Sequence, residues 1–153
     1  MDLSSILMGL GLLVLFLGPI LYLIFLQKKK QRIRTRTLNE ISNNRNLSPD
    51  IVESTDMLVL GLDTKARTLI VVEPLRNNQA EVFELENFRF IRLRTTGASH
   101  KEEKYLKIIC ELVSKDKKTY EVVFYDDDQD LNLDSEAELI RAKKWQEIIG
   151  RYL

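Results

Sequence analysis

The chain has 153 residues, with 23 basic and 23 acidic side chains, one cysteine and one histidine. This length is that of one small domain with flanking segments, and a single cysteine excludes an internal disulfide. The sequence contains no glycine-rich phosphate loop, paired zinc ligands or serine-nucleophile motif. It therefore favours a binding protein over the common classes of enzyme.

Residues 3–26 carry no charged side chain. A stretch of this length predicts a single N-terminal transmembrane helix, with the lipid bilayer as a partner. A cleavable signal peptide is the alternative, but Asp2 stands where a basic residue is usual and no small-residue cleavage site follows. Ser4, Gly11 and Gly18 share one helix face. Small residues on one face allow two such helices to pack closely, so a homo-oligomer through the span is one explanation. The other explanation is that glycine is common in membrane helices.

A basic cluster follows the apolar stretch and is made of Lys28, Lys29, Lys30, Arg32, Arg34 and Arg36. Basic flanks stay on the cytoplasmic side of a membrane, so the charge asymmetry predicts an outside N-terminus and a cytoplasmic C-terminal domain. The same cluster is a candidate contact for anionic lipid headgroups. Nucleic acid is not an expected partner, because no aromatic or groove-reading element accompanies the charges. Residues 27–55 are expected to form a basic, partly helical tether.

Residues 56–153 are the expected folded domain. Residues 46–153 contain 16 basic and 21 acidic side chains, a net charge of −5, in contrast to the basic tether. Apolar residues alternate with polar ones in short runs separated by turn residues, which predicts six strands in a mainly antiparallel meander or barrel. Ser135 and Glu138 have the spacing of a capping box, and Leu139, Ala142, Trp145, Ile149 and Tyr152 follow at helical spacing. An amphipathic helix over about 135–153 is therefore expected to close the domain.

The hairpin series from Met57 to Tyr125, followed by "LIRAKKWQEII" with Trp145, resembles the pleckstrin-homology-like fold. That fold has seven strands, so the resemblance implies one further strand, between Asp126 and Leu133. An open antiparallel sheet with the helix on one face is the alternative architecture. Domains that resemble this fold usually bind lipids, peptides or other proteins and seldom catalyse reactions, so the resemblance implies a binding function.

Few side chains offer chemistry. His100 lies in a polar loop without a visible partner, and Cys110 alternates with apolar residues and is expected inside the core. Asp126, Asp128 and Asp130 have the first spacings of a calcium loop, but Leu131 and Ala137 occupy its glycine and glutamate positions. No catalytic residue, cofactor or metal is expected.

Three arginines form the candidate surface for a protein partner: Arg89, Arg92 and Arg94, of which two share a strand face. Charged edge strands that prevent aggregation are the alternative explanation. The sequence thus predicts a membrane-anchored cytoplasmic interaction module, an adaptor or scaffold without catalytic activity. A small accessory subunit of a membrane protein complex is the second hypothesis, and an enzyme with an unrecognised site is the third.

Overall fold

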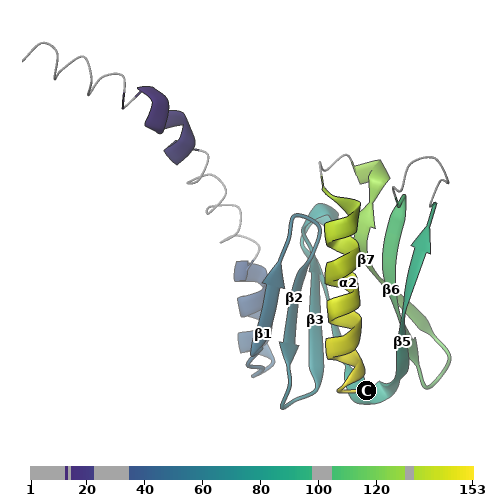
Figure 1. Cartoon of the computed structure of the whole chain (residues 1–153). Helices are drawn as coiled ribbons and strands as arrows, with labels where there is room; N and C mark the ends of the chain where they lie inside the picture. The colour runs from purple at the N-terminus through teal and green to yellow at the C-terminus, as the bar shows by residue number, and fades with distance from the viewer. Residues whose placement is uncertain (1–12, 14, 23–34, 98–104, 130–132) are drawn as a thin grey trace, which may run out of the picture. The chain divides into compact units, whose positions relative to one another are not determined.

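The computed structural model describes residues 13, 15–22, 35–97, 105–129 and 133–153. The chain divides into two compact units, Met1–Ile33 and Arg34–Leu153. The second unit holds two antiparallel sheets and the helical segments that pack on them (Figure 1). It is an α+β domain rather than the mainly-β domain expected from the sequence.

The prediction of a transmembrane helix over residues 3–26 is wrong. In this stretch the described residues 13 and 15–22 are helical. Among the described residues, no helix is long and apolar enough to cross a membrane. The single-pass membrane location, the outside N-terminus and the cytoplasmic domain depend on that span and are overturned with it.

The first sheet contains four strands in chain order: β1 (Ile51–Ser54), β2 (Val59–Asp63), β3 (Thr68–Glu73) and β4 (Gln79–Glu84). The turn between β2 and β3 is stabilised by Asp63, whose carboxylate accepts the backbone N–H groups of Lys65 and Ala66 at 3.1 and 2.9 Å. Between β3 and β4, the short 3-10 helix η1 (Pro74–Arg76) ends in Asn77 and Asn78, both with positive φ. Asparagine adopts this conformation more readily than most residues, so this hairpin is encoded locally.

The second sheet contains three strands, β5 (Phe88–Thr96), β6 (Lys107–Ser114) and β7 (Thr119–Asp126), in the order β5-β6-β7. The 3-10 helix η2 (Leu85–Asn87) carries the chain from one sheet to the other, and a further one, η3 (Asp127–Gln129), follows β7. Leu85 in η2 is fully buried, so the turn is fixed in the core and β5 does not pair with β4. The predicted single meander or barrel is wrong for this reason.

The structure also differs from the sequence in the number of strands. It has seven strands in the described residues, and the one not predicted is β1, which precedes Asp56. It pairs with β2 from Ile51↔Leu62 to Ser54↔Val59. Residues 126–133, where a hidden strand is expected, are partly outside the described residues; η3 lies in their described part.

The main core lies between the two sheets and α2 (Ser135–Gly150), the helix that closes the domain. Trp145 is fully buried there, together with Ala142 and Ile149 from the same helix face. The N-cap of α2 is Asp134 rather than Ser135, because the Asp134 carboxylate accepts the N–H of Glu136 at 3.0 Å. The helix therefore begins where expected but is capped one residue earlier.

A second, smaller core covers the other face of the first sheet. Residues 35–44 are helical, and Leu38 from this segment packs with Val59, Ile70 and Val72. Gly61 in β2 leaves the space for it, because a Cβ atom at this position would lie 2.7 Å from Cδ1 of Leu38. The two central strands of the first sheet, β2 and β3, are therefore buried on both faces.

Candidate functional site

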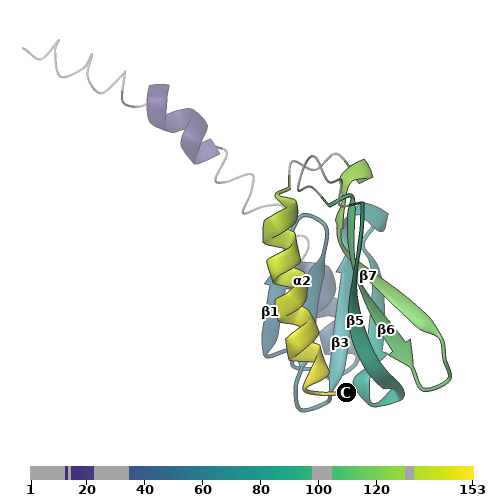
Figure 2. The ribbon, with the colours of Figure 1, turned by 45° about the vertical axis from the view of Figure 1, so that its right-hand side comes forward.

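The candidate site is a shallow groove between β5 and α2. Figure 2 shows the two elements side by side. The groove has a volume of about 540 Å³ and is lined by Arg89, Phe90, Ile91, Gln146, Glu147, Gly150 and Leu153. Gly150 lies on the helix side of the groove, and a Cβ atom there would meet only Cγ2 of Ile91, at 3.9 Å. A methyl group therefore fits at position 150, at ordinary contact distance from the Ile91 side chain.

The strand that borders the groove is an edge strand. Among the described residues, β5 pairs with β6 on one side only, and at nine residues it is the longest of the edge strands β1, β4, β5 and β7. The backbone groups on the free side of such a strand can pair with another extended chain. The pairing with β6 is regular from Phe90 to Thr96.

A β-bulge sets the direction of the side chains in β5. Phe88 pairs with Ser114 and Phe90 with Val113, so Arg89 is the extra residue. The bulge lets both Phe88 and Ile91 face the interior, whereas Phe90 is 43% exposed. Bulges occur often at sheet edges and beside functional sites, and this one places the Arg89 side chain at the groove.

Arg92 and Arg94 lie on the outer face of the second sheet and share one carboxylate. Nε of Arg92 donates to Oε2 of Glu111, and Nη1 of Arg94 donates to Oε1 at 3.1 Å. The Glu111 side chain is 2% exposed, whereas those of Arg92 and Arg94 are 60% and 58% exposed. The hydrogen bond from Arg92, followed by that from Arg94, holds the pKa of Glu111 below its ordinary range despite burial.

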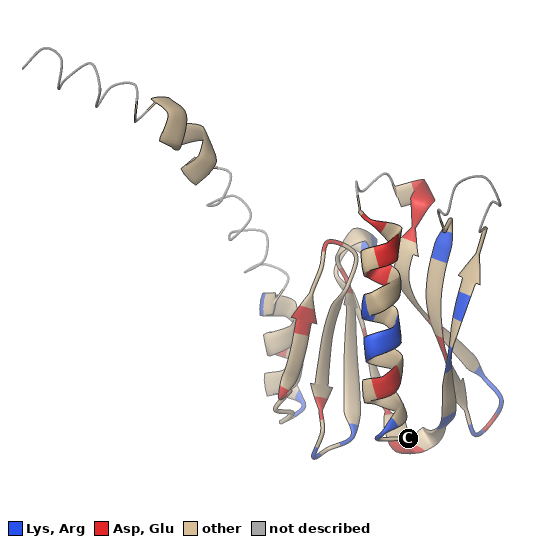
Figure 3. Ribbon diagram, in the orientation of Figure 1, with Lys and Arg blue, Asp and Glu red and all other residues tan. Residues whose placement is uncertain are grey.

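Sequence reasoning selected the three arginines but missed Glu111. The structure joins Arg92 and Arg94 through it and leaves Arg89 separate, in the groove. Figure 3 marks the basic residues of β5 and the charges along α2. The sequence does show that Glu111 interrupts the apolar run "KIICELV", which is unusual for a buried strand. The strand pairing then places this glutamate directly opposite Arg92.

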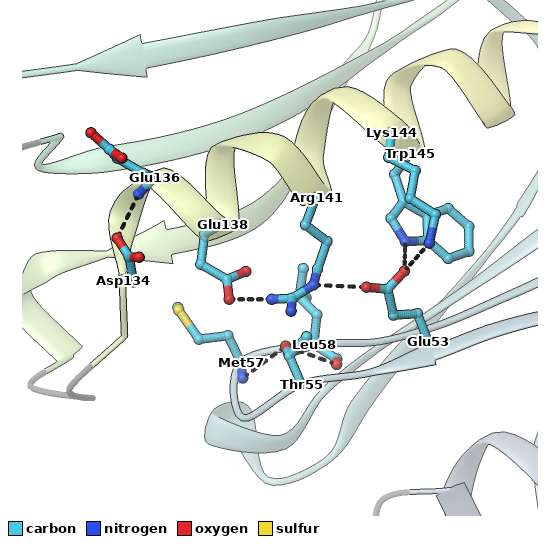
Figure 4. A network of polar contacts seen from close by, with 10 residues as sticks. All are labelled: Glu53, Thr55, Met57, Leu58, Asp134, Glu136, Glu138, Arg141, Lys144 and Trp145. Carbon is cyan, nitrogen blue, oxygen red and sulfur yellow. Dashed lines mark hydrogen bonds and ion pairs between the residues drawn. The ribbon is translucent and has the colours of Figure 1, made fainter.

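Polar contacts fix the helix side of the site (Figure 4). Glu53 of β1 accepts hydrogen bonds from Nε of Arg141, Nζ of Lys144 and Nε1 of Trp145 at 2.7, 3.1 and 2.9 Å. Arg141 also pairs with Glu138. Partial burial would raise the pKa of Glu53, but the bonds from Trp145, Lys144 and Arg141 outweigh it and lower the value. These contacts join α2, the helix that forms one side of the groove, to β1 of the first sheet.

The remaining candidate residues lie elsewhere. Cys110 is 1% exposed and its Sγ is 3.7 Å from the carbonyl oxygen of Ala142; burial raises the pKa of its thiol to about 12. His100 and Asp130 are outside the described residues, as are Lys28, Lys29, Lys30, Arg32 and Arg34. Arg36 pairs with Glu40 at 2.8 Å on the helical segment 35–44. Among the described residues, no group of histidine, cysteine or acidic side chains is arranged to hold a metal ion.

Two further hollows occur in the described part of the domain. One, of about 450 Å³, lies between β4 and β7 and has the edge-to-face rings of Phe83, Phe88 and Tyr120 on its wall. The other, of about 130 Å³, lies beside Met57 and Leu75. The β5 site differs from both in that two arginines of its edge strand are held by one buried carboxylate, that of Glu111.

Comparison of the chain with models of protein families, with curated proteins and with solved structures finds no match.

Proposed function

We propose that this protein is a non-catalytic interaction module that binds an extended segment of another protein along β5. The observation that carries the proposal is the free edge of β5 beside an open groove. An added strand gains main-chain hydrogen bonds from the edge, and its alternate side chains gain contacts in the groove. Both requirements meet in β5.

The other edge strands are weaker candidates for this role. β1 has four residues, which offers few backbone groups, and its Glu53 is occupied by α2. β4 and β7 border a hollow whose wall is a packed aromatic cluster. Only β5 is long, lies beside α2 and carries three arginines.

We also propose that the domain resembles the pleckstrin-homology-like fold. Seven strands followed by a C-terminal helix support it, and the functions that it implies are binding functions. The proposal rests on β5 and its groove, and it stands independently of that resemblance.

The test uses peptides selected from a displayed library of disordered segments, with amide hydrogen exchange as the readout. A selected peptide should slow exchange in β5 and leave the edges β1 and β4 unchanged. Gly150→Phe should abolish binding by filling the groove, whereas Gly150→Ala should preserve it, because a Cβ atom fits there. Protection at another edge, or binding unaffected by Gly150→Phe, would refute the proposed site.

A further inference from the structure

The outer face of β5 carries the guanidinium groups of Arg92 and Arg94, and both donate hydrogen bonds to the buried carboxylate of Glu111. Glu111 contributes one negative charge and the two guanidinium groups contribute two positive charges, so the trio keeps one positive charge. Arg92 uses Nε and Arg94 uses Nη1 in the described contacts with Glu111. Each guanidinium group has five N–H donors, so both arginines have donors beyond these contacts for the carboxylate of a bound segment.

Strand geometry determines which side chains of a bound segment would reach these arginines. Successive side chains of a strand point to opposite faces, and directly opposed residues of an antiparallel pair lie side by side on one face. Every second side chain of an added strand would therefore stand beside Arg92 and Arg94. The intervening side chains would point to Ile91 and Gly150 in the groove.

We propose that Arg92 and Arg94 make the β5 site selective for segments with acidic side chains at alternate positions and apolar side chains between them. Glu111 is a positioning residue in this arrangement, because its buried carboxylate holds both guanidinium groups on one face. The inference rests on the proposed function, since it requires a segment paired with β5. It adds the sequence pattern that this segment must have.

Charge complementarity supports an acidic occupant. Arg89, Arg92 and Arg94 are exposed, and Arg89 lies at the groove end of the same strand. Phe90 is 43% exposed on the face of Arg92 and Arg94. It offers an apolar contact next to the acidic positions. A basic segment would meet the arginines with like charge, which is destabilising at directly opposed positions of a strand pair.

The test measures binding of three labelled peptides to the full chain by fluorescence anisotropy. Each alternates valine with a second residue over about seven positions, the reach of an ordinary strand; the second residue is glutamate, glutamine or lysine. The glutamate peptide should bind at least about tenfold more tightly than the glutamine peptide, because a carboxylate accepts stronger hydrogen bonds from guanidinium groups. The lysine peptide should bind most weakly.

Three variants assign this preference to residues. Arg92→Gln and Arg94→Gln should each reduce the preference for glutamate over glutamine, measured as the ratio of the two dissociation constants, because the carboxylate loses more than the amide when a guanidinium group is removed. Arg45→Gln removes one positive charge beyond the helical segment on the first sheet and should change neither value. Glu111→Gln removes a negative charge, yet it should weaken the preference because an amide has one acceptor oxygen in place of two and can no longer hold both guanidinium groups.

The outcomes separate this inference from the proposed function. Equal binding of glutamate and glutamine peptides, with protection of β5, would overturn the selectivity and leave the function standing. No binding of any peptide, including the library-selected ones, would overturn both. A stronger glutamate preference in Glu111→Gln would show that charge alone acts, and would refute the positioning role of Glu111.

Discussion

The contact between Leu38 and Gly61 makes a sharp prediction about how the helical segment 35–44 is held on the first sheet. In Gly61→Ala, the new Cβ atom would lie 2.7 Å from Cδ1 of Leu38 and must displace it. In Leu38→Ala, the obstructing atoms are gone. The effect of Gly61→Ala should therefore depend on which residue occupies position 38.

The magnitudes follow from burial. Leu38 is 2% exposed, so Leu38→Ala should lower the free energy of unfolding by about 2–5 kcal/mol. Gly61→Ala should cost about 1–3 kcal/mol in the native background, because the packed leucine has little room to move. In the Leu38→Ala background it should be neutral or stabilising by up to about 1 kcal/mol, since glycine weakens a strand. The double variant should therefore be more stable than the sum of the single effects by about 1–4 kcal/mol.

Urea titration followed by the fluorescence of Trp145 measures the free energy of unfolding of the native chain, the two single variants and the double variant. Trp145 is a suitable probe because it is the only tryptophan of the chain and is fully buried. Ile140→Ala is the matched control: Ile140 is 69% exposed on α2 and should be additive with Gly61→Ala. Additivity of Gly61→Ala with Leu38→Ala would refute the reasoning, because it would mean that Leu38 does not occupy the space above Gly61.

Three further predictions concern the main core and its polar contacts. Trp145→Ala should lower the free energy of unfolding by about 3–5 kcal/mol, because the indole is fully buried; a change near zero in urea titration would contradict its core position. The pKa of Glu53 lies below its ordinary value of 4.5, since hydrogen bonds from Trp145, Lys144 and Arg141 outweigh the effect of burial. Its stabilisation is therefore present above the unfolded-state pKa and is lost as the pH falls through the folded-state pKa, so Glu53→Gln should flatten the acid side of the stability profile. Burial raises the pKa of Cys110 to about 12, so iodoacetamide at about pH 8 should label it only on unfolding; rapid labelling of the native protein would show that the thiol is accessible.

The strands and the closing helix are largely readable from the sequence, because each forms from local patterns. The alternation in "YLKIICELV" and "TYEVVFY" corresponds to β6 and β7, and helical spacing from Leu139 onward corresponds to α2. The division into two sheets is not readable in this way. Alternation continues through β4 and β5, and only the burial of Leu85 in the folded domain separates the two strands.

The apolar stretch and the candidate site show two other limits of sequence reasoning. Hydropathy alone does not specify the extent of a helix, and among the described residues no helix is long and apolar enough to cross a membrane. The arginines of β5 are visible as charges, but their pairing through Glu111 depends on the register between β5 and β6. The groove depends on the approach of Gly150 to Ile91, two residues that lie 59 positions apart in the sequence.

The bonds from Glu53 to α2 have a consequence for the order in which the chain folds. They join residues that are 88 to 92 positions apart, so Glu53 obtains these hydrogen-bond donors from a helix that is synthesised much later than β1. Contacts of such high sequence separation form slowly and late. During translation, the carboxylate of Glu53 therefore stays in water until α2 has left the ribosome. A chain that stops before Ser135 would present an incomplete core to the cell's chaperones and proteases.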